Sequence, residues 1–569
     1  MSAEQSSQPA WKALVAEKRA RQQASIPSDW FSLIEPHIPS ADTLDVSGIP
    51  DQCTELLSER EREITNTLDV QVLLAKLASG TWSSVEVTTA FYKRAIIAQN
   101  LTNCLTEIFV EQALARAAEV DEYLKKTGKP MGPLHGLPVS LKDQICIKGL
   151  ETTMGYVSWI GKYAERDAAL VEILYKCGAV PFVRTNVPQT LMWPETFNNV
   201  FGRTVNPHNR LLTCGGSSGG EGALVAMRGS PLGVGSDIGG SIRIPSAMCG
   251  VYGLRPSYNR IPYEGAVNSL LGQDSVPSVL GPLANSISGL KAFTQAVVSA
   301  EPWRLDPLCV RKKWDEDAYR LSEHGGGERM CFAVMWDDGV VKPHPPVIRG
   351  LEMVKKALEA KGHKVIDWVP WKHSEMIENL SAIWAAGAAE DYAVTTQPTG
   401  EPILASMTDD AMTSEAPFRP SHTDTISAYQ LWQLHLKKQK LRKEYLDRWE
   451  ATVEQTGTGR PVDAIIAPVS PWLAPPHGKN TNCGFTMVWN LLDYAALVIP
   501  VSKLDEKVDV KQPPHKFLSK EDENVYNLYE PATFKNAPIA VQVVGRTLEE
   551  EGVIGMAELV DAALKDVAR

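Results

Sequence analysis

The sequence lacks several patterns that mark common classes of protein. Its nine cysteines form no CxxC pair and follow no regular spacing, so no disulfide framework is predicted. No apolar run reaches the length of about 18 residues that a membrane-spanning helix needs. The first residues lack the basic-then-apolar order of a signal peptide. We therefore expect a reduced, cytoplasmic protein without a transmembrane segment.

Motifs for nucleotides, metals and nucleic acids are also missing. There is no GxxxxGK[ST], and the pair Gly233 and Gly235 lacks a third glycine at the dinucleotide spacing. The eleven histidines are dispersed and none belongs to an HExxH motif, which argues against a catalytic metal. A net charge of −11 disfavours nucleic acid as a partner. We expect no cofactor and no metal.

What is present indicates an α/β fold. Helix-like stretches followed by glycine and then a strand-like run occur at 167–188 and again at 350–369. The segment 133–145 reads as a short buried strand that ends at Lys142. Further strand-like segments lie near the C-terminus, at 462–469, 495–501 and 538–546.

The N-terminal part is predicted to be helical. We expect residues 1–65 to form a helical arm that lies on one large domain of residues 66–569, and a peripheral helix to span 426–450. The N-terminal helices are predicted at 10–22, 69–80, 83–100 (capped by Ser83 or Ser84) and 113–128 (stopped by Gly128).

Glycine concentrates in one segment. Residues 214–253 contain twelve of the 41 glycines in the chain. Within it, "GGSSGG" (215–220) matches the GxSxG pattern of α/β-hydrolases, although such a match arises easily in a glycine-rich stretch. In "DIGGSIRIPS" (237–246), Ser241 follows two glycines, which suits either a tight turn or an exposed nucleophile.

Together these motifs resemble the amidase signature family. The resemblance rests on "GGSSGG", "DIGGSIRIPS" and the upstream "SLKD", and it continues through "TTMGY", "TNVPQ", "LLDYAALVIPV" and "PIAVQVVG". "GQDSVPSVLGPLANS" and "EPWRLDP" are most similar to the fungal acetamidase-type branch. The resemblance implies a single large α/β domain with a central mixed β-sheet flanked on both faces by helices. It also implies hydrolysis of a carboxylic amide, a small-molecule substrate, to acid and ammonia or amine, without a cofactor. Acetamide-like, aromatic and long-chain acyl amides all stay open as substrates, and a homodimer is implied at the level of the family.

The resemblance implies a Ser-Ser-Lys triad. Ser241 would be the acyl-ester nucleophile, Ser217 the bridging serine after a cis peptide bond, and Lys142 the general base. A serine hydroxyl needs a base, and an ammonium group cannot serve as one. Burial of Lys142 would lower its pKa, so that a neutral amine takes the proton of Ser241 through Ser217.

The glycines before Ser241 are expected to form an oxyanion hole. Backbone N–H groups aimed at one point stabilise the charge of a tetrahedral intermediate, and missing side chains allow close approach. The residues expected to contact the substrate are Ile238, Gly239, Gly240, Ser241 and Ser217.

Further residues have predicted supporting roles. Asp237 and Arg243 are expected to brace the glycine-rich loop through charged hydrogen bonds, together with Ser218, and Asp143 is expected to be structural. Cys214 stands where the family often has proline and is expected to affect loop stiffness. The candidates for an acyl pocket are Leu191, Met192 and Trp193, with Tyr156, Trp159 and Trp489 as weaker candidates.

Three alternatives stay open from the sequence. The chain could be the glutaminase subunit of a tRNA-dependent amidotransferase, which would need a partner enzyme. It could be an esterase that uses the GxSxG serine with histidine and aspartate or glutamate. It could also be a binding protein that kept the fold but lost catalysis.

Overall fold

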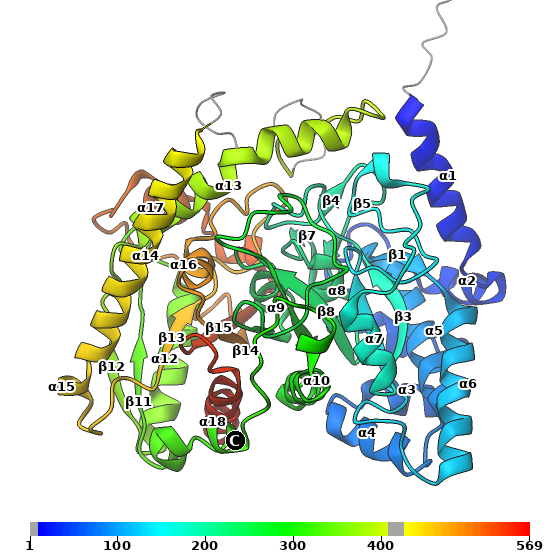
Figure 1. The fold of residues 1–569 in the computed structure, drawn as a ribbon, viewed down its shortest axis with the longest axis horizontal. Coiled ribbons are helices and arrows are strands. Elements are labelled where there is room, and N and C mark those ends of the chain that lie inside the picture. Colours follow the sequence, from blue (N-terminus) through cyan, green and yellow to red (C-terminus); the bar gives the residue numbers. More distant parts are fainter. Residues whose placement is uncertain (1–9, 408–425, 569) are drawn as a thin grey trace, which may run out of the picture.

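The centre of the protein is one twisted sheet of eleven strands (Figure 1). The computed structural model describes residues 10–407 and 426–568. β2 runs parallel to β3 and β8, and β11 runs parallel to β12 and β13, whereas the other neighbours are antiparallel. The predicted mixed α/β sheet is thus confirmed. Across the sheet the strands are β1 (Leu105–Ile108), β3 (Val180–Thr185), β2 (Pro138–Lys142), β8 (Leu232–Asp237), β10 (Val279–Ala284), β9 (Tyr252–Arg255), β14 (Ala496–Lys503), β15 (Pro538–Val544), β13 (Ala464–Pro468), β11 (Cys331–Val334) and β12 (Lys364–Asp367).

Helices cover both faces of this sheet. They are α1 (Ala10–Ala24), α2 (Ser28–Ile34), α3 (Glu59–Asn66), α4 (Val70–Ala78), α5 (Ser84–Thr102), α6 (Val110–Thr127), α7 (Ala169–Lys176), α8 (Gly219–Ala226), α9 (Arg243–Cys249), α10 (Ile287–Ser299), α11 (Glu316–Tyr319), α12 (Pro345–Ala360), α13 (His373–Thr396), α14 (Ala428–Ala451), α15 (Val453–Thr456), α16 (Gly484–Leu492), α17 (Lys520–Leu528) and α18 (Glu550–Ala568). Two small hairpins pair β4 (Phe197–Asn198) with β5 (Gly202–Arg203) and β6 (Val205–Asn206) with β7 (Asn209–Thr213). Short 3-10 turns occupy Glu35–His37, Ile49–Gln52, Val157–Trp159, Pro302–Arg304, Ser322–Gly327 and Pro531–Phe534.

The interior strand β15 shows that both faces of the sheet are covered by helices. All of its residues are buried. Val541 faces α12, where a Cβ added at Gly350 would lie 3.9 Å from it, while the next residue, Gln542, accepts a hydrogen bond from Arg243 of α9 at 3.3 Å. Successive strand residues point to opposite faces, so α9 and α12 lie on opposite sides of the sheet.

The N-terminal helices gather at one end of the sheet and α12, α14 and α15 at the other (Figure 1). α1 is joined to the body by Lys18, which forms ion pairs with Glu107 and Glu151. Ile34 and Leu57 belong to the same hydrophobic core as the strands. Residues 1–9 of the expected arm lie outside the described residues, and a boundary at residue 65 remains a prediction.

Several local predictions are confirmed. β2 ends at Lys142, and Gly128 ends α6 in a left-handed conformation. The predicted peripheral helix is α14, which exposes Trp432 and buries Tyr445. All nine cysteines are free thiols. Among residues 10–407 and 426–568, no helix combines the length and the apolar character needed to cross a bilayer.

The N-cap of α5 is Ser83, which decides between the two predicted candidates. The Ser83 hydroxyl accepts a hydrogen bond from the backbone N–H of Glu86 at 3.0 Å. The neighbouring Ser84 hydroxyl is buried and has no hydrogen-bond partner among the described residues.

Ser83→Ala is therefore expected to lower the free energy of unfolding by about 1 kcal/mol, the usual cost of losing an N-cap. Ser84→Ala removes an unsatisfied buried hydroxyl and is expected to be neutral or slightly stabilising. Denaturant unfolding of both variants checks this, and a larger loss in Ser84→Ala than in Ser83→Ala would contradict it.

Candidate active site

Lys142 lies at the end of β2, with its side chain fully buried. Its Nζ is 2.7 Å from the Ser217 Oγ and 2.8 Å from the Ser236 Oγ. At the end of β2, the amine therefore faces the glycine-rich segment that follows β7, which carries Ser217, and the last residues of β8, which include Ser236. The structure thus brings two of the predicted triad residues, Lys142 and Ser217, into hydrogen-bond distance.

The surroundings of Lys142 favour a neutral amine. Burial lowers the pKa of Lys142 well below its ordinary value, while the carboxyl groups of Asp237 and Glu221 oppose this shift. Glu221 lies on α8 and accepts hydrogen bonds from Ser140 at 2.6 Å and Thr185 at 2.8 Å. Because burial also raises the pKa of Glu221 to about 8, much of this carboxyl is uncharged near neutral pH, which weakens its hold on a proton at Lys142.

Ser236 and Gln144 fix the direction of the Lys142 amine, a role that sequence analysis missed. The Gln144 Nε2 donates to the Tyr263 hydroxyl at 2.8 Å and to the Val267 carbonyl at 2.9 Å, so its Oε1 faces Ser236. Ser236 donates to that oxygen. The Ser236 Oγ must then accept an N–H from Lys142, which leaves the lone pair of a neutral amine free to face Ser217.

The two predicted triad serines, Ser217 and Ser241, come just before two neighbouring helices. Ser217 follows a cis peptide bond after Gly216, as the family resemblance implied, and precedes α8. Ser241 precedes α9. The backbone N–H of Ser218 donates to the carbonyl of Ser241 at 3.2 Å, and the Ser218 hydroxyl donates to the carbonyl of Ser236 at the same distance. Ser218 therefore ties the two serine segments and the end of β8 together.

Asp237 and Arg243 hold the turn that carries Ser241. The carboxylate accepts from the backbone N–H groups of Gly240 (2.8 Å) and Ile242 (3.2 Å) and from the Arg243 guanidinium at 3.0 Å. Burial by itself would raise the pKa of Asp237, but Arg243 and Asn490 hold that pKa well below its ordinary value. Asp237 therefore stays ionised and fixes the turn.

The Gly240 N–H was predicted to face an oxyanion, but it donates to Asp237 instead. The cause is the conformation of the turn. Gly240 has φ +136°, and the Thr486 hydroxyl holds the Gly239 carbonyl at 2.6 Å. A Cβ at Gly240 would lie 2.3 Å from the Thr486 Oγ1, so only glycine fits. The N–H groups of Ile238, Gly239 and Ser241 remain as candidate oxyanion donors.

Ser241 lines a small cavity of about 30 Å³. The predicted pocket residues Leu191, Met192 and Trp193 do line it, together with nine other residues. Three of these nine were expected to contact the substrate, and the other six were not singled out in the sequence. The weaker candidates do not: Tyr156 bonds Ser269, Trp159 packs beside Tyr156, and Trp489 lies in an aromatic cluster with Tyr445 and Tyr494. The full lining is Leu191, Met192, Trp193, Pro194, Gly216, Ile238, Gly239, Ser241, Ile244, Trp384, Cys483 and Met487.

Sequence analysis missed Trp384 and Met487 because each lies on a helix with no motif of its own. α13 was not predicted, and α16 drew notice only through Trp489. The single usable signal was the helical spacing within "TMVWNLL", which places Thr486, Met487 and Asn490 near one another on one face of the helix.

Two predicted residues prove to be packing or structural groups. The Cys214 thiol is buried, lies 3.4 Å from the Thr204 carbonyl, and burial raises its pKa to about 12. Asp143 accepts hydrogen bonds from Thr106, Thr153 and the backbone N–H of Met154, all at 2.8 Å. Neither side chain faces the cavity at Ser241.

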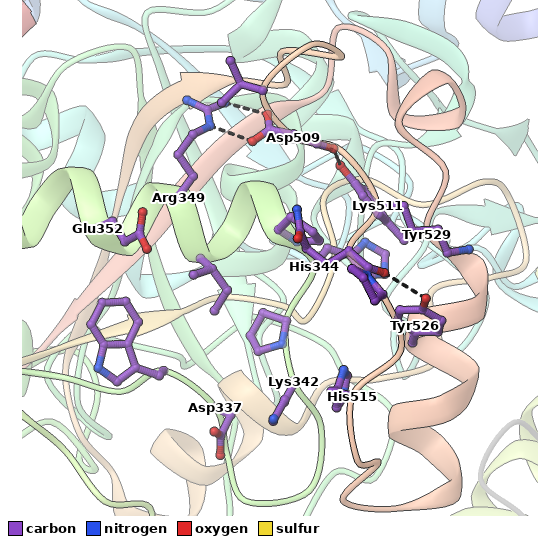
Figure 2. Close-up of a pocket in the computed structure, with 17 residues that line it drawn as sticks. Asp337, Lys342, His344, Arg349, Glu352, Asp509, Lys511, His515, Tyr526 and Tyr529 are labelled. Atoms are coloured by element: carbon purple, nitrogen blue, oxygen red, sulfur yellow. Dashed lines mark hydrogen bonds and ion pairs between the residues drawn. The ribbon is translucent and has the colours of Figure 1, made fainter.

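A larger cavity of about 580 Å³ lies elsewhere, among α12, α17 and residues 508–515 (Figure 2). Among its lining residues, Arg349 is bound to Asp509 at 2.7 Å, Lys511 to Glu530 at 2.8 Å and His515 to Asp522 at 2.9 Å. None of its described lining residues is a serine, threonine or cysteine, and none also lines the cavity at Ser241. The larger cavity therefore offers no nucleophile of the predicted kind.

Within the described ranges, no three His, Cys, Asp or Glu side chains are grouped as metal ligands. No histidine is found among the described residues around Ser241 either. A buried lysine, two serines and a braced glycine turn are groups that could carry out acyl transfer.

Comparison with known proteins identifies the family. Residues 86–554 match the family described as Amidase. The chain belongs to this family. It is 43% identical to the acetamidase of Aspergillus oryzae, over 97% of this chain and 99% of that protein. It is likewise 43% identical to the acetamidase of Emericella nidulans, over 98% and 99% of the two chains. The resemblance inferred from the motifs, including its fungal acetamidase branch, is confirmed.

The amidase fold is equally clear in solved structures. A fatty acid amide hydrolase superposes with a TM-score of 0.87 at 32% identity, over 97% of this chain and 95% of that one. A 6-aminohexanoate cyclic dimer hydrolase, at 21% identity and a TM-score of 0.69, shares the fold.

Ser236→Ala is expected to lower kcat about 10- to 100-fold, because the amine of Lys142 loses the acceptor that directs it. An accepted N–H favours the ammonium form, so its loss should also move the acid limb of the pH profile to lower pH. Profiles of kcat/KM against pH check both effects.

Ser230→Ala is the matched control, since Ser230 is a buried serine whose hydroxyl donates to the Leu232 carbonyl at 2.8 Å. It should leave the profile unchanged. A Ser236→Ala enzyme with wild-type kcat and an unmoved acid limb would contradict the positioning role.

Proposed function

We propose that this amidase hydrolyses short-chain carboxylic amides to acid and ammonia through an acyl-enzyme on Ser241, with Ser217 as bridge and Lys142 as base. The observation that carries the proposal is the 2.7 Å contact between the buried Lys142 Nζ and the Ser217 Oγ, beside a cavity that Ser241 lines. The small size of that cavity and the similarity to two acetamidases favour a short acyl group.

In the first half-reaction, the neutral amine of Lys142 takes the hydroxyl proton of Ser217. Ser217 in turn takes the proton of Ser241, whose Oγ attacks the carbonyl carbon of the amide. The carbonyl oxygen becomes negative and faces the backbone N–H groups of Ile238, Gly239 and Ser241. Each such donor contributes roughly 3–4 kcal/mol to the stability of the transition state.

The same relay then runs in reverse. The proton on Lys142 passes through Ser217 to the amide nitrogen, the C–N bond breaks, and ammonia leaves with the acyl group on Ser241. Protonation of the nitrogen matters because an amide anion is too basic to leave. A water molecule next gives a proton to the relay, attacks the acyl ester and releases the acid, which restores the Ser241 hydroxyl.

The alternatives left open by the sequence have less support. An esterase that uses Ser217 with histidine would need an imidazole beside that hydroxyl, where a lysine amine lies instead. A glutaminase would release ammonia from glutamine, which carries a charged α-amino acid head. The described walls of the cavity at Ser241 carry no charged side chain that could bind such a head.

Ser241→Ala is expected to lower kcat for acetamide by at least about 10⁴-fold, and Lys142→Ala by a comparable factor, since the triad acts as a unit. Ammonia release from acetamide, hexanamide, benzamide and glutamine measures this. A fluorophosphonate should label wild type at Ser241 and fail to label Ser241→Ala. Near wild-type turnover in Lys142→Ala would remove lysine as the base, and preference for glutamine would favour the glutaminase.

The activity is expected to rise with pH along a single acid limb and to be retained at neutral pH. The reactive form of Lys142 is the neutral amine, so activity is lost as pH falls through its pKa. Burial places that pKa well below the ordinary lysine value. A pH profile of kcat/KM on acetamide checks this, and a limb at about pH 10 would show an unperturbed lysine.

Two finer expectations remain predictions. A cytoplasmic location fits the nine free thiols, since disulfides are rare in that compartment. The homodimer is carried only by family resemblance, and the mass of the protein in solution measures it.

A further inference from the structure

Trp384 separates two cavities. It is the one described residue shared by the cavity at Ser241, of about 30 Å³, and by a second cavity of about 450 Å³, which we call the outer cavity. The outer cavity is lined by Leu270, Leu271, Gly272, Gln273, Asp274, Ser275, Ile383, Trp384, Ala386, Gly387, Asp391, Leu431 and His435, from the 270–275 loop, α13 and α14.

The indole of Trp384 lies directly against the turn of the nucleophile. A Cβ built on Gly239 would be 2.9 Å from the Cη2 of Trp384, so the outer edge of the ring is in contact with the glycine backbone. Trp384 is only 3% exposed. Its Nε1 is 3.5 Å from the carbonyl of Val276, and its neighbours in the same apolar cluster include Met192 and Met487.

The loop opposite Trp384 is fixed by hydrogen bonds within itself and to α13. Gln273 bonds the backbone of Val276 through two hydrogen bonds of 2.7 and 2.9 Å, and the N–H of Leu270 donates to Asp391 of α13 at 3.1 Å. Beyond the indole, α13 presents the small residues Ala386 and Gly387, and nothing lies within 4 Å of a Cβ built at Gly387. The outer cavity is therefore open on the far side of Trp384, and the indole separates it from the cavity at Ser241.

We propose that Trp384 sets the length limit for the acyl chain, and that its removal joins the two cavities into one long acyl site. The inference rests on the proposed function. In a primary amide the acyl chain is the only chain, and it must fit between the Ser241 turn and this ring. The cavity at Ser241, of about 30 Å³, is much smaller than the outer cavity of about 450 Å³, so joining the two makes room for a longer acyl chain.

The test compares kcat/KM for acetamide, butanamide, hexanamide and octanamide in wild type and in Trp384→Phe, Trp384→Leu and Trp384→Ala. The hexanamide-to-acetamide ratio should rise in that order and reach at least about tenfold over wild type in Trp384→Ala. Two variants with smaller voids keep the series informative if Trp384→Ala fails to fold. Ile383→Ala, which enlarges the outer cavity without contacting Gly239, should leave the ratio at its wild-type value.

Labelling by a small fluorophosphonate reports whether Ser241 is intact in each variant. A variant that is labelled yet keeps the wild-type ratio would overturn the length limit. Equal acceleration of all four amides would also overturn it, because it would show that Trp384 slows access without selecting length. If wild type hydrolyses none of the four amides although it is labelled, the failure lies in the proposed function instead.

Discussion

The site depends on keeping one lysine amine away from water. Lys142 comes at the end of a strand whose every residue is buried, and its Nζ meets two serine hydroxyls in place of solvent or a carboxylate partner. An ion pair would hold the proton on the amine, whereas burial without one releases it. Glu221 and Asp237 are close enough to act on Lys142, but one is largely neutralised by its own burial and the other is bound by Arg243.

The glycine-rich segment follows from the same constraint. Ser217 reaches the buried amine from the start of α8, while Ser241 comes from the start of α9, so the chain makes two tight turns that lie close to other parts of the backbone. A Cβ at Gly216 would lie 2.3 Å from the Glu195 carbonyl oxygen, and one at Gly240 would lie 2.3 Å from Thr486. The Asp237–Arg243 pair then fixes the second turn, because Arg243 also bonds Thr486 and Asn490 of α16. The conformation of the glycine-rich turn thus depends on hydrogen bonds to the distant helix α16 as well as on its own glycines.

Much of the fold could be predicted from the sequence because short-range patterns encode it, whereas the roles of Lys142, Ser217 and Ser241 were assigned through the family resemblance and remain predictions. The strand that ends at Lys142, the Gly128 stop and the glycine-flanked serines are all legible within a few residues. The roles of residues that act through contacts distant in sequence could not be predicted. Ser236 orients the lysine through Gln144, 92 positions away, and Trp384 reaches Gly239 from a helix with no motif. The direction of the Gly240 N–H was also hidden, since a side chain of α16 sets it.

The residues of the proposed triad and the residue proposed to limit the acyl chain lie on different parts of the fold. This separation suggests how one arrangement of catalytic groups can serve different amides. Lys142 lies on the central sheet, and Ser217 and Ser241 lie in the turns that lead into α8 and α9, which pack on that sheet, so a change there would disturb the whole network. Trp384 lies on α13, and its indole ring lies against Gly239 in the Ser241 turn, while the helix packs mainly on α14 and α16. A substitution at such a position alters the space for the acyl chain while the hydrogen bonds of the triad stay in place. Under the proposed length limit, a fold shared with a fatty acid amide hydrolase is compatible with a cavity of only about 30 Å³ at Ser241.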